Sequence, residues 1–222
     1  MMQINSFTIA LCVVLFTIVV VAACHFASES QGSDITSVKA TYDDKMYKVR
    51  DMPDRVEAAN LLAKLCEVIS RLNSKLGKHY PNDKRVKLLL SRYKAENVSE
   101  LSSYAGSQYT AYSVGKGRRL VFCLRTRDNQ EKLVRLQTLT FVAIHELAHV
   151  MSMSIGHTEE FWDNMRFLLA NAIEWNLYKS VNYSKKPQAY CGLQITATPL
   201  PEGQVARSKY VTYDQSSTVE ET

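Results

Sequence analysis

The chain has 222 residues and a formal net charge of +5, with 46% hydrophobic and 22% charged residues. These values are near the globular average and exclude a wholly disordered chain, a collagen and a coiled-coil rod. The length suits one large domain or two small ones, and five cysteines are too few for a small disulfide scaffold.

The N-terminal segment is almost wholly apolar. Only two threonines interrupt the apolar side chains from Phe7 to Cys24. A helix of this length spans roughly 27 Å, at about 1.5 Å per residue, which is close to the thickness of the hydrocarbon core of a bilayer. We therefore predict a short flank at residues 1–6, a transmembrane anchor at residues 7–27 and a single-pass membrane localisation.

Two other interpretations of this segment stay open. It could be a cleaved signal peptide, or a lipoprotein signal, because Val21-Ala22-Ala23-Cys24 is similar to a bacterial lipobox. The first residues, MMQINS, contain no Lys or Arg, which disfavours both. For the same reason the positive-inside rule predicts no orientation. The sequons at Asn97 and Asn182 are weak evidence for a lumenal domain.

A polar linker is predicted at residues 28–36, followed by a domain at residues 37–200. Val38 to Val49 alternates between apolar and polar residues around two aspartates, as a short hairpin does. Asp54 and Glu57 form a capping-box pattern at the start of an amphipathic helix that ends at Gly77. Its apolar stripe consists of Leu62, Leu65, Ile69, Leu72 and Leu76.

The rest of the domain alternates between helix and strand patterns. Lys84–Lys94 is a helix or a strand, and Tyr109–Leu124 is two strands around a Gly-Lys-Gly turn. Leu136–Met153 is apolar nearly all round and predicts a central, buried helix. Thr158 can cap a following helix. The apolar face of that helix holds Phe161, Met165, Leu168, Leu169, Ala172 and Ile173. Residues 201–222 are polar and predict a flexible tail.

The strongest chemical signal is an H-E-x-x-H motif within the predicted central helix. His145 and His149 are four residues apart, so their imidazoles share one helix face about 6 Å apart and can bind one zinc ion at about 2.0–2.1 Å. Glu146 is rotated by about 100° from His145 and can reach a water on the metal. Buried His and Glu without partners would cost several kcal/mol, which a metal would offset.

A catalytic zinc site needs three protein ligands and one open position. His157 is the best third ligand, because Gly156 can turn the chain back towards the helix. Glu159, Glu160 and Asp163 are lesser candidates. The bland alternative is a buried, hydrogen-bonded histidine pair without metal.

The cysteines and basic residues carry weaker signals. Cys66, Cys123 and Cys191 have no C-x-x-C partner, so a structural zinc site is not predicted, although Cys191 could approach the active site. Two loose basic clusters are interpreted as a solvated face: Lys84, Arg85, Lys87, Arg92 and Lys94, then Arg118, Arg119, Arg125 and Arg127. Nucleic acid is not an expected partner, because only Tyr93 is interleaved with this charge.

The segment FVAIHELAHVMSMSIGHTEEFW resembles the signature of WLM and SprT-like metallopeptidases, with HELxH, a downstream His and a Phe-Trp pair. The wider stretch from about residue 36 to 200 is closer still to WLM-like proteins of large nucleocytoplasmic DNA viruses and some algae. The similar segments are Tyr47–Arg50, Ala58–Ala63, Lys116-Gly117, Cys123–Arg125 and Tyr190–Gly192. The spacing from His149 to His157 is two residues longer than in many WLM proteins.

The resemblance implies an α+β, zincin-like domain with a small, partly antiparallel sheet packed on the active-site helix. It implies that His145, His149 and His157 bind zinc and that Glu146 is the general base. We thus expect a membrane-anchored zinc metallopeptidase with a peptide or protein substrate. Tyr190 and Tyr183 are guesses for the oxyanion-stabilising residue. Oligomeric state is not predicted.

Two alternatives to this function stay open. One is a non-catalytic membrane scaffold stabilised by zinc, which a fourth ligand such as Cys191 would support. The other is a DNA-associated protease, since some relatives cleave proteins crosslinked to DNA. An N-terminal anchor disfavours the second alternative, because a tethered domain cannot reach chromatin freely.

Overall fold

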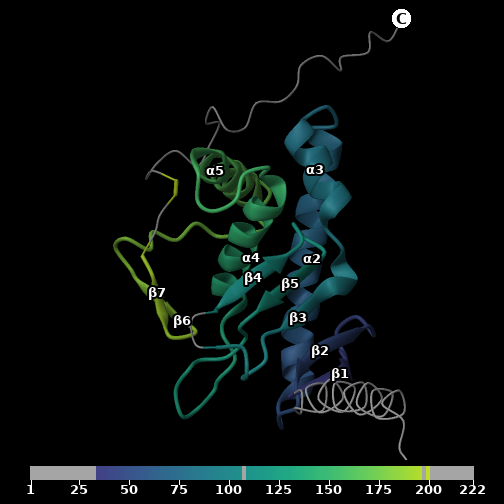
Figure 1. Ribbon diagram of the computed structural model, residues 1–222, viewed down its shortest axis with the longest axis vertical. Coiled ribbons are helices and arrows are strands. Elements are labelled where there is room, and N and C mark those ends of the chain that lie inside the picture. Colours follow the sequence, from purple (N-terminus) through teal and green to yellow (C-terminus); the bar gives the residue numbers. More distant parts are fainter. Residues whose placement is uncertain (1–33, 107–108, 197–198, 201–222) are drawn as a thin grey trace, which may run out of the picture. The chain divides into compact units, whose positions relative to one another are not determined.

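The computed structural model describes residues 34–106, 109–196 and 199–200 (Figure 1). Five strands form one sheet in the order β1-β2-β3-β5-β4. Pairing is antiparallel at both edges, β1 with β2 and β4 with β5, and parallel in the middle. The strands are β1 (Ile35–Lys39), β2 (Met46–Arg50), β3 (Val98–Glu100), β4 (Ala111–Val114) and β5 (Arg119–Phe122). The predicted α+β class with a small, partly antiparallel sheet is confirmed.

Four α-helices accompany this sheet in the described residues. They are α2 (Arg55–His79), α3 (Lys84–Arg92), α4 (Leu136–Met151) and α5 (Glu159–Glu174), and a 3-10 turn, η1, covers Ala95–Asn97. Helix α2 packs on β1, β2 and β3, and α4 packs on β4 and β5. Helix α4 also contacts α2, α3 and α5, so it lies at the centre of the domain.

The burial of α4 follows from its composition. Twelve of its residues are buried, on all sides of the helix, as expected for a helix without a polar face. The predicted stripe of α2 is likewise buried in full, from Leu62 to Leu76. Lys84–Arg92 is a helix, which resolves the helix-or-strand ambiguity, and its first turn is capped by the Asp83 carboxylate, which accepts from Arg85 N at 2.8 Å.

Two details of the predicted helix boundaries are wrong. Gly77 does not end α2, which continues to His79. A Cβ on Gly77 would lie 3.1 Å from Leu90 Cδ1, so this glycine allows α3 to approach α2 closely. Asp54 precedes α2 but makes no side-chain cap. Its carboxylate instead accepts a hydrogen bond from Arg125 Nη1 at 2.6 Å.

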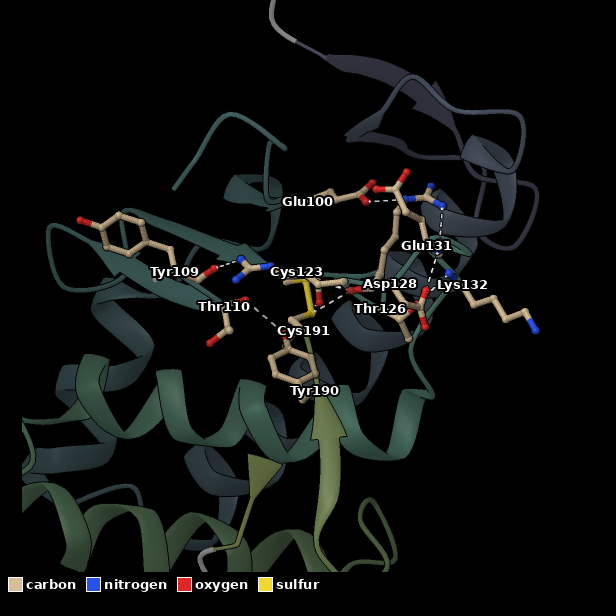
Figure 2. The surroundings of a disulfide bond; sticks show 12 residues. Glu100, Tyr109, Thr110, Cys123, Thr126, Asp128, Glu131, Lys132, Tyr190 and Cys191 are labelled. Carbon is tan, nitrogen blue, oxygen red and sulfur yellow. Dashed lines mark hydrogen bonds and ion pairs between the residues drawn. A yellow bond between two sulfur atoms is a disulfide. The ribbon is translucent and has the colours of Figure 1, made fainter. Parts of the chain in front are cut away.

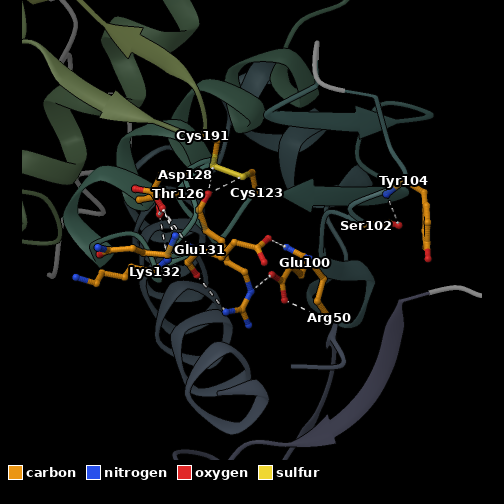
Figure 3. Close-up of polar contacts among 12 residues, drawn as sticks. Arg50, Glu100, Ser102, Tyr104, Cys123, Thr126, Asp128, Glu131, Lys132 and Cys191 are labelled. Carbon is orange, nitrogen blue, oxygen red and sulfur yellow. Dashed lines mark hydrogen bonds and ion pairs between the residues drawn. A yellow bond between two sulfur atoms is a disulfide. The ribbon is translucent and has the colours of Figure 1, made fainter. Parts of the chain in front are cut away.

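The prediction that Arg125 lies on a solvated face is wrong, because its side chain belongs to a buried ion-pair network. Its side chain is only 3% exposed, and Nε donates to Glu100 Oε1 at 2.9 Å. Glu100 also accepts from the backbone N of Arg50 at 2.7 Å, at the end of β2 (Figure 3). The network therefore joins β2, β3 and the segment after β5, which are distant in sequence. Burial of such charges is tolerated only when each has a partner.

Two of the cysteines form a disulfide that the sequence analysis does not predict. Cys123 and Cys191, 68 residues apart, form a disulfide (Figure 2). It fixes the hairpin of β6 (Gln188–Tyr190) and β7 (Leu193–Ile195) to the end of β5. Neither this hairpin nor β3 was predicted, because three-residue strands give no periodicity signal. Cys66 is buried in α2, as expected.

The N-terminal and C-terminal predictions mostly concern residues outside the described ranges. The anchor at residues 7–27 and the tail at residues 201–222 lie there. The linker predicted at residues 28–36 extends two residues too far, because β1 begins at Ile35. Within residues 34–106, 109–196 and 199–200, no helix is both long and apolar enough to cross a membrane.

The ion-pair network gives a stability prediction. Replacing Glu100 by Ala leaves Arg125 with only the partly exposed Asp54 as a carboxylate partner. We expect the free energy of unfolding to fall by about 3 kcal/mol, the lower end for a broken buried ion pair. Urea denaturation followed by circular dichroism measures it. The control Asp51→Ala, which breaks an exposed pair with Arg55, should change it by less than about 1 kcal/mol. Equal effects would contradict a structural role of the network.

Candidate metal centre

His145 and His149 lie one turn apart on α4, as the motif predicts. Their ring centroids are 5.0 Å apart. The helix is formed by residues of high helix propensity such as Leu and Ala, and its C-terminal carbonyls are bound by side chains from outside the helix. Both imidazoles are therefore carried by a fixed backbone and not by a mobile loop.

The loop after α4 brings His157 to the same place. Gly156, at φ +83°, takes the left-handed conformation that turns the chain back, and a side chain there would be strained. The His157 ring lies 4.9 Å from the His145 ring and 5.0 Å from the His149 ring. The three rings thus form a nearly equilateral triangle. Each offers one nitrogen, and these nitrogens all lie within 4.8 Å of one another.

This geometry fits one tetrahedral metal ion. His145 Nε2 and His157 Nε2 are 3.1 Å apart. Two nitrogens that are each about 2.05 Å from a tetrahedral zinc ion would be about 3.3 Å apart. Burial, with the neighbouring histidines, lowers the pKa of His145 to about 3 and that of His149 to about 4. Both rings are thus neutral at pH 7, the form that donates a lone pair to a metal.

Phe161 forms the base beneath this histidine triad. Its fully buried ring is 4.8, 4.3 and 4.7 Å from the rings of His145, His149 and His157. It is the first buried residue of α5, three residues after the N-cap Thr158, whose hydroxyl accepts from Phe161 N. The ring excludes water from one side of the triad and restricts all three imidazoles.

Charged side chains hold the loop that carries His157. Arg92 Nη1 donates to Val150 O at 2.8 Å and to Ser152 O at 3.0 Å, and Lys116 Nζ donates to Ser152 O and Ser154 O. The Glu160 carboxylate accepts from the backbone N of Met153 and Ser154. These bonds satisfy backbone groups at the end of α4 and fix the entry of the loop.

Glu146 is the remaining ionisable group beside the triad. It is 6% exposed, and burial raises its pKa to about 7. It lies on the edge of two cavities, which also share His145 and His157. The apolar cavity, about 370 Å³, lies between α4, α5 and the β6–β7 hairpin. The polar cavity, about 510 Å³, lies between α4, the end of β4 and the His157 loop.

The lesser ligand candidates are engaged elsewhere. Glu159 and Asp163 each accept from Arg166 Nη2 at 2.7 Å, and Glu160 holds the loop backbone. Cys191 is bonded to Cys123 and cannot serve as a thiolate ligand. Among the described residues, no fourth His, Cys, Asp or Glu joins the triad.

The two tyrosine guesses have different outcomes. Tyr190 lines the apolar cavity with Glu146, but its hydroxyl is buried and directed to Cys123 O at 2.9 Å and Thr110 O at 3.3 Å (Figure 2). Tyr183 packs edge-on against Phe141, and its hydroxyl accepts from Tyr178. Tyr183 lines neither of the two cavities beside Glu146, so the structure does not bring it to this site.

Sequence reasoning missed the residues that support the loop. Arg92 was interpreted as part of a solvated face, and Lys116 as part of a turn. Their positions in the chain do not predict this role, because they donate to backbone carbonyls near residue 152, and a backbone carbonyl is present at every residue. Lys116 can reach them because Gly117, at φ +100°, lets the β4–β5 turn lie against Val150, where a Cβ would approach to 2.8 Å.

The fold and the site together define an α+β protein with a candidate three-histidine metal centre. An uncharacterized protein of Acanthamoeba polyphaga mimivirus is 31% identical over 181 residues, which cover 80% of this chain and 91% of that protein. The chain belongs to the same family as this mimivirus protein. No family model matches the chain, and no solved structure gives a significant match.

The triad predicts stoichiometric metal binding. In a Co²⁺ titration of the purified full chain, we expect about one equivalent to bind with the visible absorption of a tetrahedral ion. His149→Ala should weaken affinity by at least about 100-fold, more than loss of a group that only supports a ligand. The control His79→Ala removes a ring stacked on Trp175, outside the triad. Unchanged affinity in His149→Ala would contradict the ligand assignment.

Proposed function

We propose that the protein is a zinc-dependent metallopeptidase. The single observation that carries the proposal is the position of Glu146, a buried carboxylate beside three imidazoles that converge on one point. Three neutral nitrogen ligands with an open position are typical of catalytic zinc sites. The similarity of residues 141–162 to WLM and SprT-like metallopeptidases, and the zincin-like fold that it implies, support the same function.

The chemistry divides between the metal and the chain. Zinc bound to three histidines polarises a carbonyl group and makes a water molecule more acidic. The chain holds all three imidazoles in place over Phe161, and burial lowers the pKa of His145 and His149, so that both rings are neutral at pH 7. Glu146 accepts a proton from the attacking water and passes it to the leaving amine. Burial keeps the pKa of this carboxylate close to neutrality, which suits a group that both takes and returns a proton.

A peptide is the substrate that suits the surroundings of Glu146. Strand β4 is the edge strand of the sheet beside this residue. Ala111 of β4 lines both cavities, and Tyr112 and Ser113 continue along the polar one. An extended peptide can add to a free strand edge through main-chain hydrogen bonds. This would lay the substrate backbone across the triad from one cavity to the other.

The alternatives receive less support. A zinc-stabilised scaffold would need a closed site, but the described residues supply three ligands and Cys191 is in a disulfide. For a DNA-associated protease, Arg92 and Arg125 would be needed on a solvated basic face. Both are instead bonded within the protein, to backbone carbonyls and to carboxylates.

The proposal includes a membrane anchor at residues 7–27, with the metallopeptidase domain held at the surface. Disulfides persist in oxidising compartments, so Cys123–Cys191 favours a domain on the oxidising side of that membrane. Exposure of Asn97 in its sequon agrees with that side.

The role of Glu146 is tested by Glu146→Gln, which keeps the shape of the side chain but removes its basicity. We expect peptide hydrolysis to fall by at least about 100-fold, within the range of general-base contributions, with bound zinc and melting temperature unchanged. The control Glu159→Gln alters an exposed carboxylate on α5 that pairs with Arg166. Loss of zinc in Glu146→Gln would make Glu146 a ligand, and equal activity in both variants would exclude it as the base.

The anchor is tested by alkaline carbonate extraction of membranes from cells that express the full chain. We expect the protein to stay in the membrane pellet, and a chain that begins at residue 28 to move to the supernatant. A mature N-terminus near Ala27 in the purified full-length protein would instead show cleavage and overturn the anchor.

A further inference from the structure

The apolar cavity directly adjoins the candidate metal centre. It shares His145, Glu146 and His157 with the triad and has a volume of about 370 Å³, at the low end for ligand pockets. Its walls come from α4, α5 and the β6–β7 hairpin. The apolar side chains that form them are Phe141, Val142, Trp162, Met165, Leu193 and Ile195. Such a space suits one large side chain.

The formal charge among the described residues that line this cavity is of one sign, negative. Among its described lining residues, Glu146 carries the only formal carboxylate and no Lys or Arg is present. The other polar lining groups are neutral threonines, Gln194 and the Tyr190 hydroxyl, which is already bonded to main-chain carbonyls. An acidic side chain in this cavity would lose its hydration and also face Glu146. A basic one would lose its hydration too, and its one available counter-ion among the described lining residues would be Glu146, the proposed general base.

The polar cavity on the other side of Glu146 differs in kind. Besides the histidine triad, Glu146 and Ala111, it is lined by Tyr112, Ser113, Gly115, Lys116, Ile155 and Gly156. It therefore contains a cation, Lys116, which the described lining of the apolar cavity lacks. The substrate path proposed along β4 thus passes from an apolar space to a polar one at Glu146. This asymmetry distinguishes the two residues that flank the reacting bond.

The walls of the apolar cavity are held in place before any ligand binds. Cys191 ties the hairpin to Cys123, and Tyr190 donates to main-chain carbonyls of Cys123 and Thr110 (Figure 2). Met165 and Phe141 are buried in the core. Leu193, 56% exposed, lies at the solvent side. A preformed pocket loses little entropy when it takes up a side chain.

We propose that this cavity is a specificity pocket that takes a large aliphatic or aromatic side chain directly next to the cleaved bond. The inference rests on the proposed peptidase function and names its substrate class. Peptides with Leu or Phe at one of the two positions that flank the bond are hydrolysed faster than peptides with Ala there. Peptides with Asp, Glu, Lys or Arg at that position are disfavoured.

The test uses the zinc-loaded full chain and a peptide library randomised on both sides of the cleaved bond. We expect kcat/KM at one flanking position to be at least about tenfold higher for Leu or Phe than for Ala. Ile195→Lys places a cation in the half-buried wall and should reduce that ratio to about one while improving acceptance of Asp and Glu. The control Val56→Lys adds the same charge at an exposed position on α2, and should keep the ratio.

A binding measurement separates this inference from the peptidase proposal. In the Glu146→Gln chain, Trp162 reports entry into the cavity by a change in fluorescence, and a Trp175→Phe background removes the other tryptophan. A peptide series with Leu, Phe, Ala or Asp at the relevant position should bind with the same order of preference. Apolar preference in binding without any hydrolysis by the parent chain would support the pocket and overturn the peptidase. Hydrolysis without preference between Leu, Phe and Ala, or a preference unaffected by Ile195→Lys, would overturn the pocket.

Discussion

Helix α4 places two imidazoles and a carboxylate in a largely apolar core, and the rest of the site compensates for that burial. His145 and Glu146 are mostly withdrawn from water, and burial shifts both their pKa values towards the neutral form. Each of the three imidazoles offers one nitrogen at the same place, and His145 Nε2 and His157 Nε2 lie 3.1 Å apart. A bound cation would satisfy all three at once. Burial of these groups costs stability in the absence of a metal, and a bound metal would offset that cost.

Two separate supports hold the groups around α4. The first fixes the His157 loop through main-chain bonds from Arg92, Lys116 and Glu160, with Phe161 beneath the rings. The second fixes the cavity wall through the Cys123–Cys191 disulfide and the Tyr190 hydroxyl. A metal site needs ligands held to within tenths of an ångström, so these supports matter as much as the ligands.

The Arg125 network links this arrangement to the sheet. Arg125 follows Cys123 by two residues, and its pairing with Glu100 and Asp54 holds the segment after β5 against β3 and the start of α2. The disulfide connects that same segment, through Cys123, to Cys191 in the β6–β7 hairpin. Ion pairs and disulfide together place the hairpin over α4, so the apolar cavity depends on charges outside it.

The sequence alone predicted α2, α4 and α5, both hairpins at the sheet edges, and the triad with Glu146, but it left residues 84–94 open between helix and strand. These features repeat at short intervals: a stripe from Leu62 to Leu76, or histidines four residues apart, is set by the helical period. Tertiary structure alone decided the pairing of Cys123 with Cys191 and the burial of Arg125. It also decided that the β6–β7 hairpin lines the apolar cavity and that Arg92 donates to carbonyls at the end of α4. Each joins residues far apart in the chain, and a single sequence contains no period or spacing that specifies which distant partner a cysteine or an arginine meets. Only the packing of α4 against the sheet brings those partners within bonding distance.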